Sequence, residues 1–212
     1  MSVLAARGVG YARDGRSILS EVEFEVKAGE RVAVVGPSGS GKSTLLAILA
    51  GLISPTTGEV RLDGRALTGP PPPSAGVAVI LQGYGLVSLL TAAENIEIAL
   101  RAAGLSPPAA QKASHAALTT VGLDGHAHHL IEELSGGQQQ RTAIARALAL
   151  KPRVLIADEP TAELDPAART LVMAHLLEPA VEGGSLVLAT HDLEVAERCD
   201  RVVELHPPAP AP

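Results

Sequence analysis

A glycine-rich segment near the N-terminus has the residue types and the spacing needed to bind phosphate groups. Its residues are Gly36, Pro37, Ser38, Gly39, Ser40, Gly41, Lys42, Ser43 and Thr44. The glycines let the backbone curl so that N–H groups converge on phosphate oxygens. Lys42 can reach the β- and γ-phosphates, and the Ser43 hydroxyl can coordinate Mg²⁺. A glycine-rich turn with a solvated lysine is the alternative, but the G-x-x-x-x-G-K-[ST] pattern predicts a nucleoside triphosphate site.

Two adjacent carboxylates follow an apolar run farther along the chain. Asp158 and Glu159 come directly after Val154–Ala157. Ligands of open α/β sheets bind beyond the C-terminal ends of the strands, where the glycine-rich segment is also expected. Asp158 can then hold Mg²⁺ opposite Ser43, and Glu159 can orient or deprotonate an attacking water molecule. A solvated acidic loop is the alternative, and the glycine-rich segment upstream favours the catalytic interpretation.

The elements that position these residues are predicted to form an α/β fold. Short apolar runs separated by helical patterns are typical of strands buried on both faces of a parallel sheet. These runs are Arg31–Val35, Val77–Leu81, Val154–Ala157 and Ser185–Ala189. Alternating runs near the N-terminus predict an antiparallel β-layer beside that core. They are Val3–Val9, Glu21–Val26 and Glu59–Leu62.

The chain is predicted to form one domain over residues 1–205. The stretch from about Thr91 to Ile131 is rich in Ala and Leu and is broken at Gly104–Pro108 and Gly122–Gly125, so it predicts two or three helices. We therefore expect a core of residues 1–82 and 151–205 with an inserted helical subdomain over about residues 83–150. Residues 206–212 form a Pro/Ala-rich tail that cannot bury apolar surface and is expected to be disordered.

Composition limits the classes of partner. The formal net charge is −6 and the sequence contains no Lys/Arg-rich run, which argues against duplex nucleic acid as the main partner. A single cysteine, Cys199, cannot form an internal disulfide and fits a reducing compartment. The longest apolar run, near Leu45–Ile53, is too short to cross a bilayer. A role in transport would therefore require a separate membrane-spanning chain.

A further motif indicates which class of phosphate-binding protein this is. Leu134, Ser135, Gly136, Gly137 and Gln138 match all five positions of LSGGQ. The segment resembles the signature motif of the ABC (ATP-binding cassette) ATPases. The serine and glycines precede a predicted helix over Gln138–Leu150, so their N–H groups and hydroxyl can bind phosphate or simply cap that helix. The resemblance implies head-to-tail pairing of two cassettes, in which each signature closes over the phosphate segment of its partner.

Other residues fall at the family's functional positions in the expected order. By resemblance, Gln82 is the Q-loop glutamine that contacts Mg²⁺ and the attacking water, and His191 is the switch histidine that bonds the γ-phosphate. Tyr11 resembles the aromatic residue that stacks on adenine. A polar residue or a histidine at a strand end is often structural, so the assignments of Gln82 and His191 depend on their place in the series.

The resemblance covers about residues 3–205, with two departures from the family pattern. Ser88 stands where a proline is frequent, and Glu163 replaces a small residue in the segment Ala162–Asp165, which resembles the D-loop. Asp165 followed by Pro166 is also an ideal start for a helix, so capping is at least as well supported there as catalysis.

The resemblance implies an ATP-binding and ATP-hydrolysing subunit that powers a transporter. Its cofactors would be ATP and Mg²⁺. Its partners would be a second copy or a similar cassette and an integral membrane subunit, which would place it in the cytoplasm on the inner face of the cell membrane. One alternative is a non-transport ABC ATPase of DNA repair, chromosome organisation or translation. A scaffold that binds ATP, recruits membrane partners and hydrolyses slowly is the other.

Overall fold

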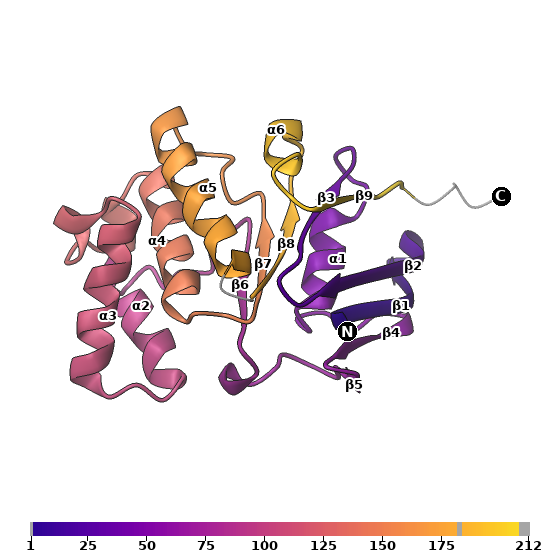
Figure 1. The fold of residues 1–212 in the computed structure, drawn as a ribbon, viewed down its shortest axis with the longest axis horizontal. Helices are drawn as coiled ribbons and strands as arrows, with labels where there is room; N and C mark the ends of the chain where they lie inside the picture. Colours follow the sequence, from indigo (N-terminus) through magenta and orange to yellow (C-terminus); the bar gives the residue numbers. More distant parts are fainter. Residues whose placement is uncertain (1, 182–183, 208–212) are drawn as a thin grey trace.

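A computed structural model describes residues 2–181 and 184–207 of the chain. Two sheets stand side by side, with helices around them (Figure 1). The expected disorder of the tail falls largely on residues 208–212, which lie outside the described residues, and the division of residues 1–205 into two subdomains stays a prediction.

The central sheet has five parallel strands in the order β6-β7-β8-β3-β9. The strands are β6 (Val77–Ile80), β7 (Val154–Asp158), β8 (Ser185–Ala189), β3 (Arg31–Val35) and β9 (Arg201–Glu204). Every residue of β7 and β8 is buried, as the apolar runs predicted. Burial alternates along β6, however, so this strand is not buried on both faces as expected, because it is an edge strand of the sheet.

The second sheet is antiparallel and has the strand order β2-β1-β4-β5. Its strands are β1 (Ser2–Arg13), β2 (Arg16–Lys27), β4 (Thr57–Leu62) and β5 (Arg65–Ala66). Positive φ angles at Asp14 and Gly15 allow the tight turn between β1 and β2. This sheet is the predicted antiparallel layer, extended by β5, which the sequence pattern did not indicate.

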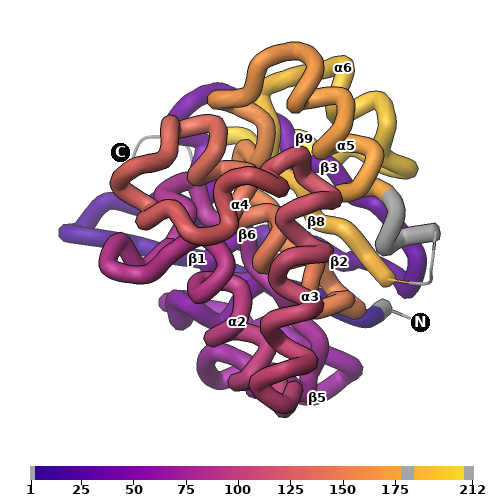
Figure 2. The backbone as a smooth tube through the Cα atoms, turned by 90° about the vertical axis from the view of Figure 1, so that its left-hand side faces the viewer, coloured from indigo at the N-terminus to yellow at the C-terminus, as the bar shows by residue number. Residues whose placement is uncertain are grey.

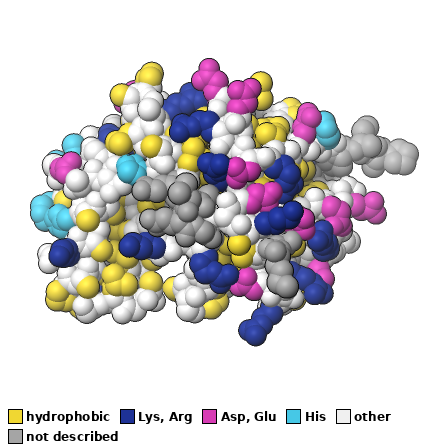
Figure 3. Space-filling view, viewed as in Figure 1, with side chains coloured by type: hydrophobic (Ala, Val, Ile, Leu, Met, Phe, Trp, Pro, Cys, Tyr) yellow, Lys and Arg dark blue, Asp and Glu magenta, His cyan; other side chains and the backbone are white. Residues whose placement is uncertain are grey.

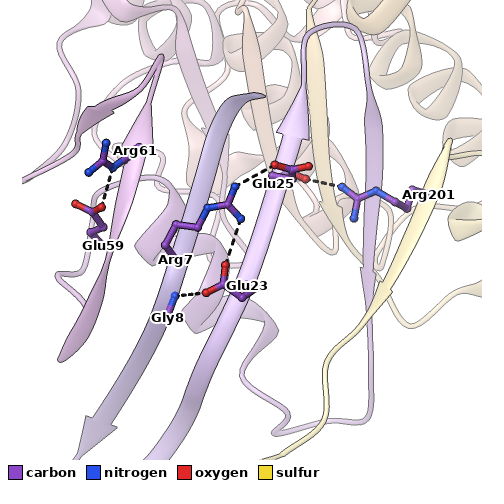
Figure 4. A network of polar contacts seen from close by, with 7 residues as sticks. All are labelled: Arg7, Gly8, Glu23, Glu25, Glu59, Arg61 and Arg201. Atoms are coloured by element: carbon purple, nitrogen blue, oxygen red, sulfur yellow. Dashed lines mark hydrogen bonds and ion pairs between the residues drawn. The ribbon is translucent and has the colours of Figure 1, made fainter. Parts of the chain in front are cut away.

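Ion pairs cover the exposed face of the antiparallel sheet (Figure 4). The guanidinium of Arg7 contacts Glu23 and Glu25 at 3.2 Å each, and Arg61 contacts Glu59 at 2.7 Å. Arg201, from the edge strand β9, donates to the backbone carbonyl of Glu25 and so links the two sheets. Figure 3 shows both signs of charge interspersed on this side of the molecule, which fits a solvated face.

Helix α1 (Lys42–Leu49) packs between the two sheets (Figure 1). Its buried side chains Leu45, Leu46, Ile48 and Leu49 share one hydrophobic cluster with β1, β2, β3 and β8. This packing fixes the start of α1 at the end of the loop that follows β3, which is the arrangement that a phosphate-binding segment needs.

The other face of the central sheet is covered by a second hydrophobic cluster formed largely by helices. These helices are α2 (Ala92–Ala102), α3 (Pro107–Thr120), α4 (Gly136–Ala149) and α5 (Pro166–Val181), and a short helix α6 (Leu193–Ala196) precedes β9. Short 3-10 turns lie at Pro73–Ala75, Asp124–His126 and Ile131–Glu133. Helices α2, α3 and α4 pack on one another at the end of the molecule farthest from the antiparallel sheet (Figures 1 and 2).

Helix α4 begins earlier than the sequence predicted. Gly136 and Gly137 were expected to lie ahead of a helix over Gln138–Leu150, but they occupy its first turn. The side chain of Ser135 accepts from the Gln138 N–H, and the side chain of Gln138 accepts from the Ser135 N–H, so this capping box starts the helix at Gly136. Within the described part of the chain, no helix combines the length and the apolar character needed to cross a bilayer.

Candidate active site

A cleft of about 1040 Å³ opens at the C-terminal edge of the central sheet. The loops that follow β3, β6, β7 and β8 all contribute to it, as expected for an open α/β sheet. The predicted site residues on its wall are Ser38, Gly39, Gly41, Lys42, Ser43, Thr44, Gln82, Asp158, Glu159 and His191. Residues as far apart in the sequence as Ser38 and His191 thus meet at one site.

The glycine-rich segment curls around the N-terminus of α1. Gly39 and Gly41 have φ angles of 80° and 94°, a backbone conformation that residues with a side chain rarely adopt. A Cβ at Gly41 would lie 2.7 Å from the side chain of Leu19, so glycine is required there on both counts. The Lys42 ammonium donates to the carbonyls of Gly36 and Pro37 at 2.8 and 3.1 Å, and it therefore folds back over its own loop.

Asp158 ends β7 and is only 5% exposed. Its Oδ1 atom has no hydrogen-bond partner among the residues that the structure describes. Burial raises the pKa of the Asp158 carboxyl, and the nearby hydroxyl of Ser43 opposes that rise. A buried carboxylate oxygen beside a hydroxyl suits a hard divalent cation such as Mg²⁺, which prefers oxygen ligands.

Glu159 and His191 form a pair at the mouth of the cleft. Glu159 Oε1 lies 2.9 Å from His191 Nδ1, and the exposed fractions of the two side chains are 15% and 72%. Glu159 has a φ angle of 47°, a left-handed conformation that is strained for a residue with a side chain. The backbone N–H of Glu159 donates to the carbonyl of Ala189 at 3.0 Å, which ties this residue to the end of β8.

Gln82 reaches the cleft from the loop after β6, and α4 holds that loop in place. Arg146 on α4 donates to the carbonyls of Tyr84 and Gly85 at 2.8 and 2.6 Å. Burial lowers the pKa of the Arg146 guanidinium. Burial also raises the pKa of the Tyr84 hydroxyl to about 12, and the nearby carboxylate of Glu163 adds to the rise.

The signature residues do not line this cleft in the described structure. Ser135, Gly136, Gly137 and Gln138 lie together at the N-terminus of α4, where Ser135 and Gln138 cap the helix. The side-chain nitrogen Nε2 of Gln138 lies 2.9 Å from Nε2 of His126. The predicted site residues therefore fall into two groups, one in the cleft and one at the start of α4.

Tyr11 is likewise not brought into the cleft wall that the structure describes. It lies on β1 opposite Leu19 of β2 and packs half-buried against the cluster around α1. The cleft wall beyond the phosphate segment includes instead Gly15 and the first residues of β2, Arg16, Ser17 and Ile18. The assignment of Tyr11 as the adenine-stacking residue stays a prediction.

Asp165 caps α5, as one of the two interpretations of the D-loop segment predicted. Its Oδ1 accepts from the N–H of Ala168 at 2.9 Å, and Pro166 is the first residue of the helix.

Sequence reasoning missed the side chains of α4 that hold the catalytic loops. Gln140 is 3% exposed, donates to the carbonyl of Glu159 at 3.0 Å and accepts from the N–H of Glu163 at 3.1 Å. A signal for Gln140 was present, because it shares the buried face of the helix with Ile144 and Ala147 at helical spacing. A polar residue in an apolar stripe indicates a specific buried partner. Arg146 gave no comparable signal, since its two acceptors are backbone carbonyls of a distant loop.

Comparison with known proteins agrees with the fold and the motifs. The family model for ABC transporters matches residues 19–162. An uncharacterized ABC transporter ATP-binding protein of Escherichia coli (strain K12), YbbA, is 42% identical over 94% of this chain and 90% of its own length. The lipoprotein-releasing system ATP-binding protein LolD of Hydrogenovibrio crunogenus is 41% identical, over 91% of this chain and 88% of its own length.

The solved structure of an ATP-binding cassette, MJ0796, in a dimeric post-hydrolysis state with ADP and Pi, is 34% identical. It superposes with a TM-score of 0.89 and covers 96% of this chain and 94% of its own. The family match, the relatives and the shared fold together show that the chain belongs to the ABC transporter family, as an ATP-binding and ATP-hydrolysing cassette.

Proposed function

We propose that the chain hydrolyses ATP in the cleft and powers transport through a separate membrane subunit by pairing head to tail with a second cassette. The observation that carries this proposal is the separation of the site into two groups. The cleft holds the residues that bind and attack a triphosphate, whereas the signature residues lie at the start of α4, outside the cleft wall. A second cassette in head-to-tail arrangement brings the two groups together.

In the cleft, the backbone of the glycine-rich segment and the N-terminus of α1 bind the phosphates. Lys42 exchanges its contacts with the carbonyls of Gly36 and Pro37 for phosphate oxygens, because an ammonium bonds more strongly to an anion than to a carbonyl. Ser43, Asp158 and Gln82 are the residues that would hold Mg²⁺. The cation, when bound, neutralises the negative charge of the phosphates.

Glu159 is the general base. Its carboxylate takes a proton from water, the water oxygen bonds to the γ-phosphorus, and the bond from that phosphorus to the β–γ bridging oxygen breaks to give ADP and phosphate. His191, 2.9 Å from Glu159 Oε1, orients this carboxylate and can bond the γ-phosphate through its other ring nitrogen.

A second cassette would supply the remaining donors for each triphosphate. The N–H groups of Gly136 and Gly137 in the first turn of α4 have no acceptor in the backbone of the helix, and the Ser135 hydroxyl, which accepts from the Gln138 N–H, lies beside them. These donors suit the γ-phosphate of a nucleotide held by the partner chain. The dimeric state of the MJ0796 cassette supports this arrangement.

The segment after Gln82 is the proposed contact for a membrane subunit. Val87 and Leu89 are 47% and 83% exposed there, and Ile98 on α2 is 57% exposed. Exposed apolar side chains of this size favour a protein partner. Such docking would hold the chain at the inner face of the cell membrane in the cytoplasm, and it fits the relative named as part of a lipoprotein-releasing system.

The shared site can be tested by mixing two inactive variants. Lys42→Ala damages the cleft of one chain, and Ser135→Arg damages the signature of the other. A mixed dimer then has one site with both lesions and one site with neither. We expect partial ATPase activity to return on mixing, up to about a quarter of the wild-type rate for random pairing when the intact site acts alone. No recovery, with mixed dimers shown by differential tagging, would contradict the shared site.

A further inference from the structure

We propose that Gln140 is a positioning residue that holds the general base Glu159 in its working conformation from helix α4. This inference rests on the proposed function, because it concerns the same hydrolytic site. Gln140 does not line the cleft that the structure describes, so it acts on the reaction through Glu159 and not on the nucleotide.

The oxygen and the nitrogen of the Gln140 amide both bond to one short segment. Its Nε2 donates to the carbonyl of Glu159 at 3.0 Å, and its Oε1 accepts from the N–H of Glu163 at 3.1 Å. A carbonyl can only accept and an N–H can only donate, so the two contacts fix the orientation of the amide. Since Gln140 is 3% exposed, water does not readily replace either contact.

The segment that Gln140 holds is strained where the base sits. Glu159 has a φ angle of 47°, and such a conformation persists only when surrounding contacts determine it. The N–H of Glu159 is held by Ala189 at 3.0 Å, and its carbonyl is held by Gln140. The other contact to that carbonyl, from the N–H of Ala162, is longer at 3.3 Å. Loss of the Gln140 contact would leave this carbonyl with the longer contact alone, so the backbone of Glu159 could relax from its strained φ and move the carboxylate away from His191.

The position of Gln140 on α4 links the base to the signature. Ser135 caps the helix that carries Gln140, and Arg146 on the same helix holds the carbonyls of Tyr84 and Gly85 after Gln82. The signature, the general base Glu159 and the loop after Gln82 are thus all attached to helix α4. Gln140 is the attachment for Glu159.

The first test compares Gln140→Met with Thr142→Val. Gln140→Met keeps much of the side-chain volume but makes neither hydrogen bond, so kcat should fall by about 10-fold or more while the KM for ATP changes by less than about twofold. Thr142→Val removes a buried hydroxyl on the same helix that bonds only within the helix, to the carbonyl of Gln138 at 2.9 Å. It should cost comparable thermal stability and leave kcat within about twofold of wild type.

The second test uses Gln140→Glu and a pH profile. A protonated glutamic acid can donate to the Glu159 carbonyl and accept from the Glu163 N–H, as glutamine does, whereas the ionised form cannot donate. The activity of this variant, divided by that of wild type at the same pH, should therefore rise as the pH is lowered. The ratio for Gln140→Met should stay flat. A flat ratio for Gln140→Glu as well would overturn the positioning role, because a general packing defect has no such signature.

A double variant separates failure of this inference from failure of the proposed function. In a Glu159→Gln background, Gln140→Met should reduce the residual hydrolysis by less than about twofold, because it acts through the base. Wild-type turnover by Glu159→Gln alone would overturn the proposed base. An inactive Glu159→Gln together with a Gln140→Met that keeps the wild-type kcat would overturn only the role of Gln140.

Discussion

The two helix N-termini that are proposed to bind phosphate differ in how they are capped. Helix α1 begins after Gly41, and no side chain of the described structure caps it, so its first N–H groups face the cleft. Helix α4 begins after Ser135, and a capping box with Gln138 satisfies part of its first turn. The proposed function therefore has the first site receive a phosphate within one chain, whereas the second is capped by its own residues and would receive a phosphate from a partner chain.

This difference predicts that lesions in the cleft weaken ATP binding by the isolated chain, and that lesions at the start of α4 do not. Lys42→Ala should have the largest effect, because it removes the cation that faces the β- and γ-phosphates. We expect no measurable turnover and affinity for ATP reduced by roughly 100-fold or more. Titration with a fluorescent ATP analogue measures the affinity without interference, since the chain has no tryptophan. Lys112→Ala, at an exposed position of α3, is the matched control. Affinity within about twofold of wild type would contradict the assignment.

His191→Ala should separate hydrolysis from binding. The substitution removes the partner of Glu159 Oε1 and a donor for the γ-phosphate, so kcat should fall by about 100-fold. ATP affinity should change little, because the glycine-rich segment and Lys42 are intact. Steady-state kinetics and nucleotide titration measure the two quantities, with His128→Ala, exposed near α3, as control. An equal loss of ATP affinity and of turnover would show that His191 contributes to ATP binding and not to hydrolysis alone.

Substitutions of Tyr11 test how the adenine of ATP is bound at the end of the cleft beyond the phosphate segment. If its ring stacks on adenine when nucleotide binds, Tyr11→Ala should lose about 1 kcal/mol of binding free energy, or roughly fivefold in affinity. Tyr11→Phe should keep most of that energy because stacking needs the ring and not the hydroxyl. Equal affinities for the two variants would show that Tyr11 does not stack on adenine. The adenine would then contact the cleft wall at Arg16–Ile18 instead.

Asp158→Asn should raise the stability of the nucleotide-free chain. Burial raises the pKa of this carboxyl, so its ionised form destabilises the fold, and this cost appears as the pH rises through the raised pKa. A neutral amide should add about 1 kcal/mol of unfolding free energy, or about 3 °C in Tm. The gain should shrink at lower pH, where wild-type Asp158 is protonated. Thermal melts with and without Mg²⁺ and ATP measure this, and a destabilised variant would contradict the proposed cost.

The cleft could be predicted from sequence to a large extent because its parts are local. The glycine-rich segment, the strand before it and the helix after it are contiguous, and the run Val154–Asp158 is fully buried as its apolar pattern indicates. The start of α4 was misplaced because glycines usually favour loops, whereas here the Ser135–Gln138 box holds them in a helical turn. Strand β9 was missed because only one of its residues is even half-buried, so it has no apolar run.

The contacts that orient the catalytic loops could not be predicted because they join distant residues. Gln140 and Glu159 are 19 positions apart, and Arg146 lies 61 positions from its acceptor Gly85. The left-handed conformation of Glu159 is equally invisible in the sequence, because the residues that bond to its N–H and its carbonyl, Ala189 and Gln140, are distant along the chain.

The most direct test of the shared site is the association state of Glu159→Gln. This variant keeps the shape of the side chain and removes both the proton acceptor and one negative charge near the triphosphate. Hydrolysis should fall by roughly 100-fold or more, while ATP still binds and bridges the cleft of one chain to the signature of the other. Size-exclusion chromatography with Mg²⁺ and ATP should show a dimer, and with ADP a monomer. An inactive variant that binds ATP and remains monomeric at all protein concentrations tested would contradict the head-to-tail dimer.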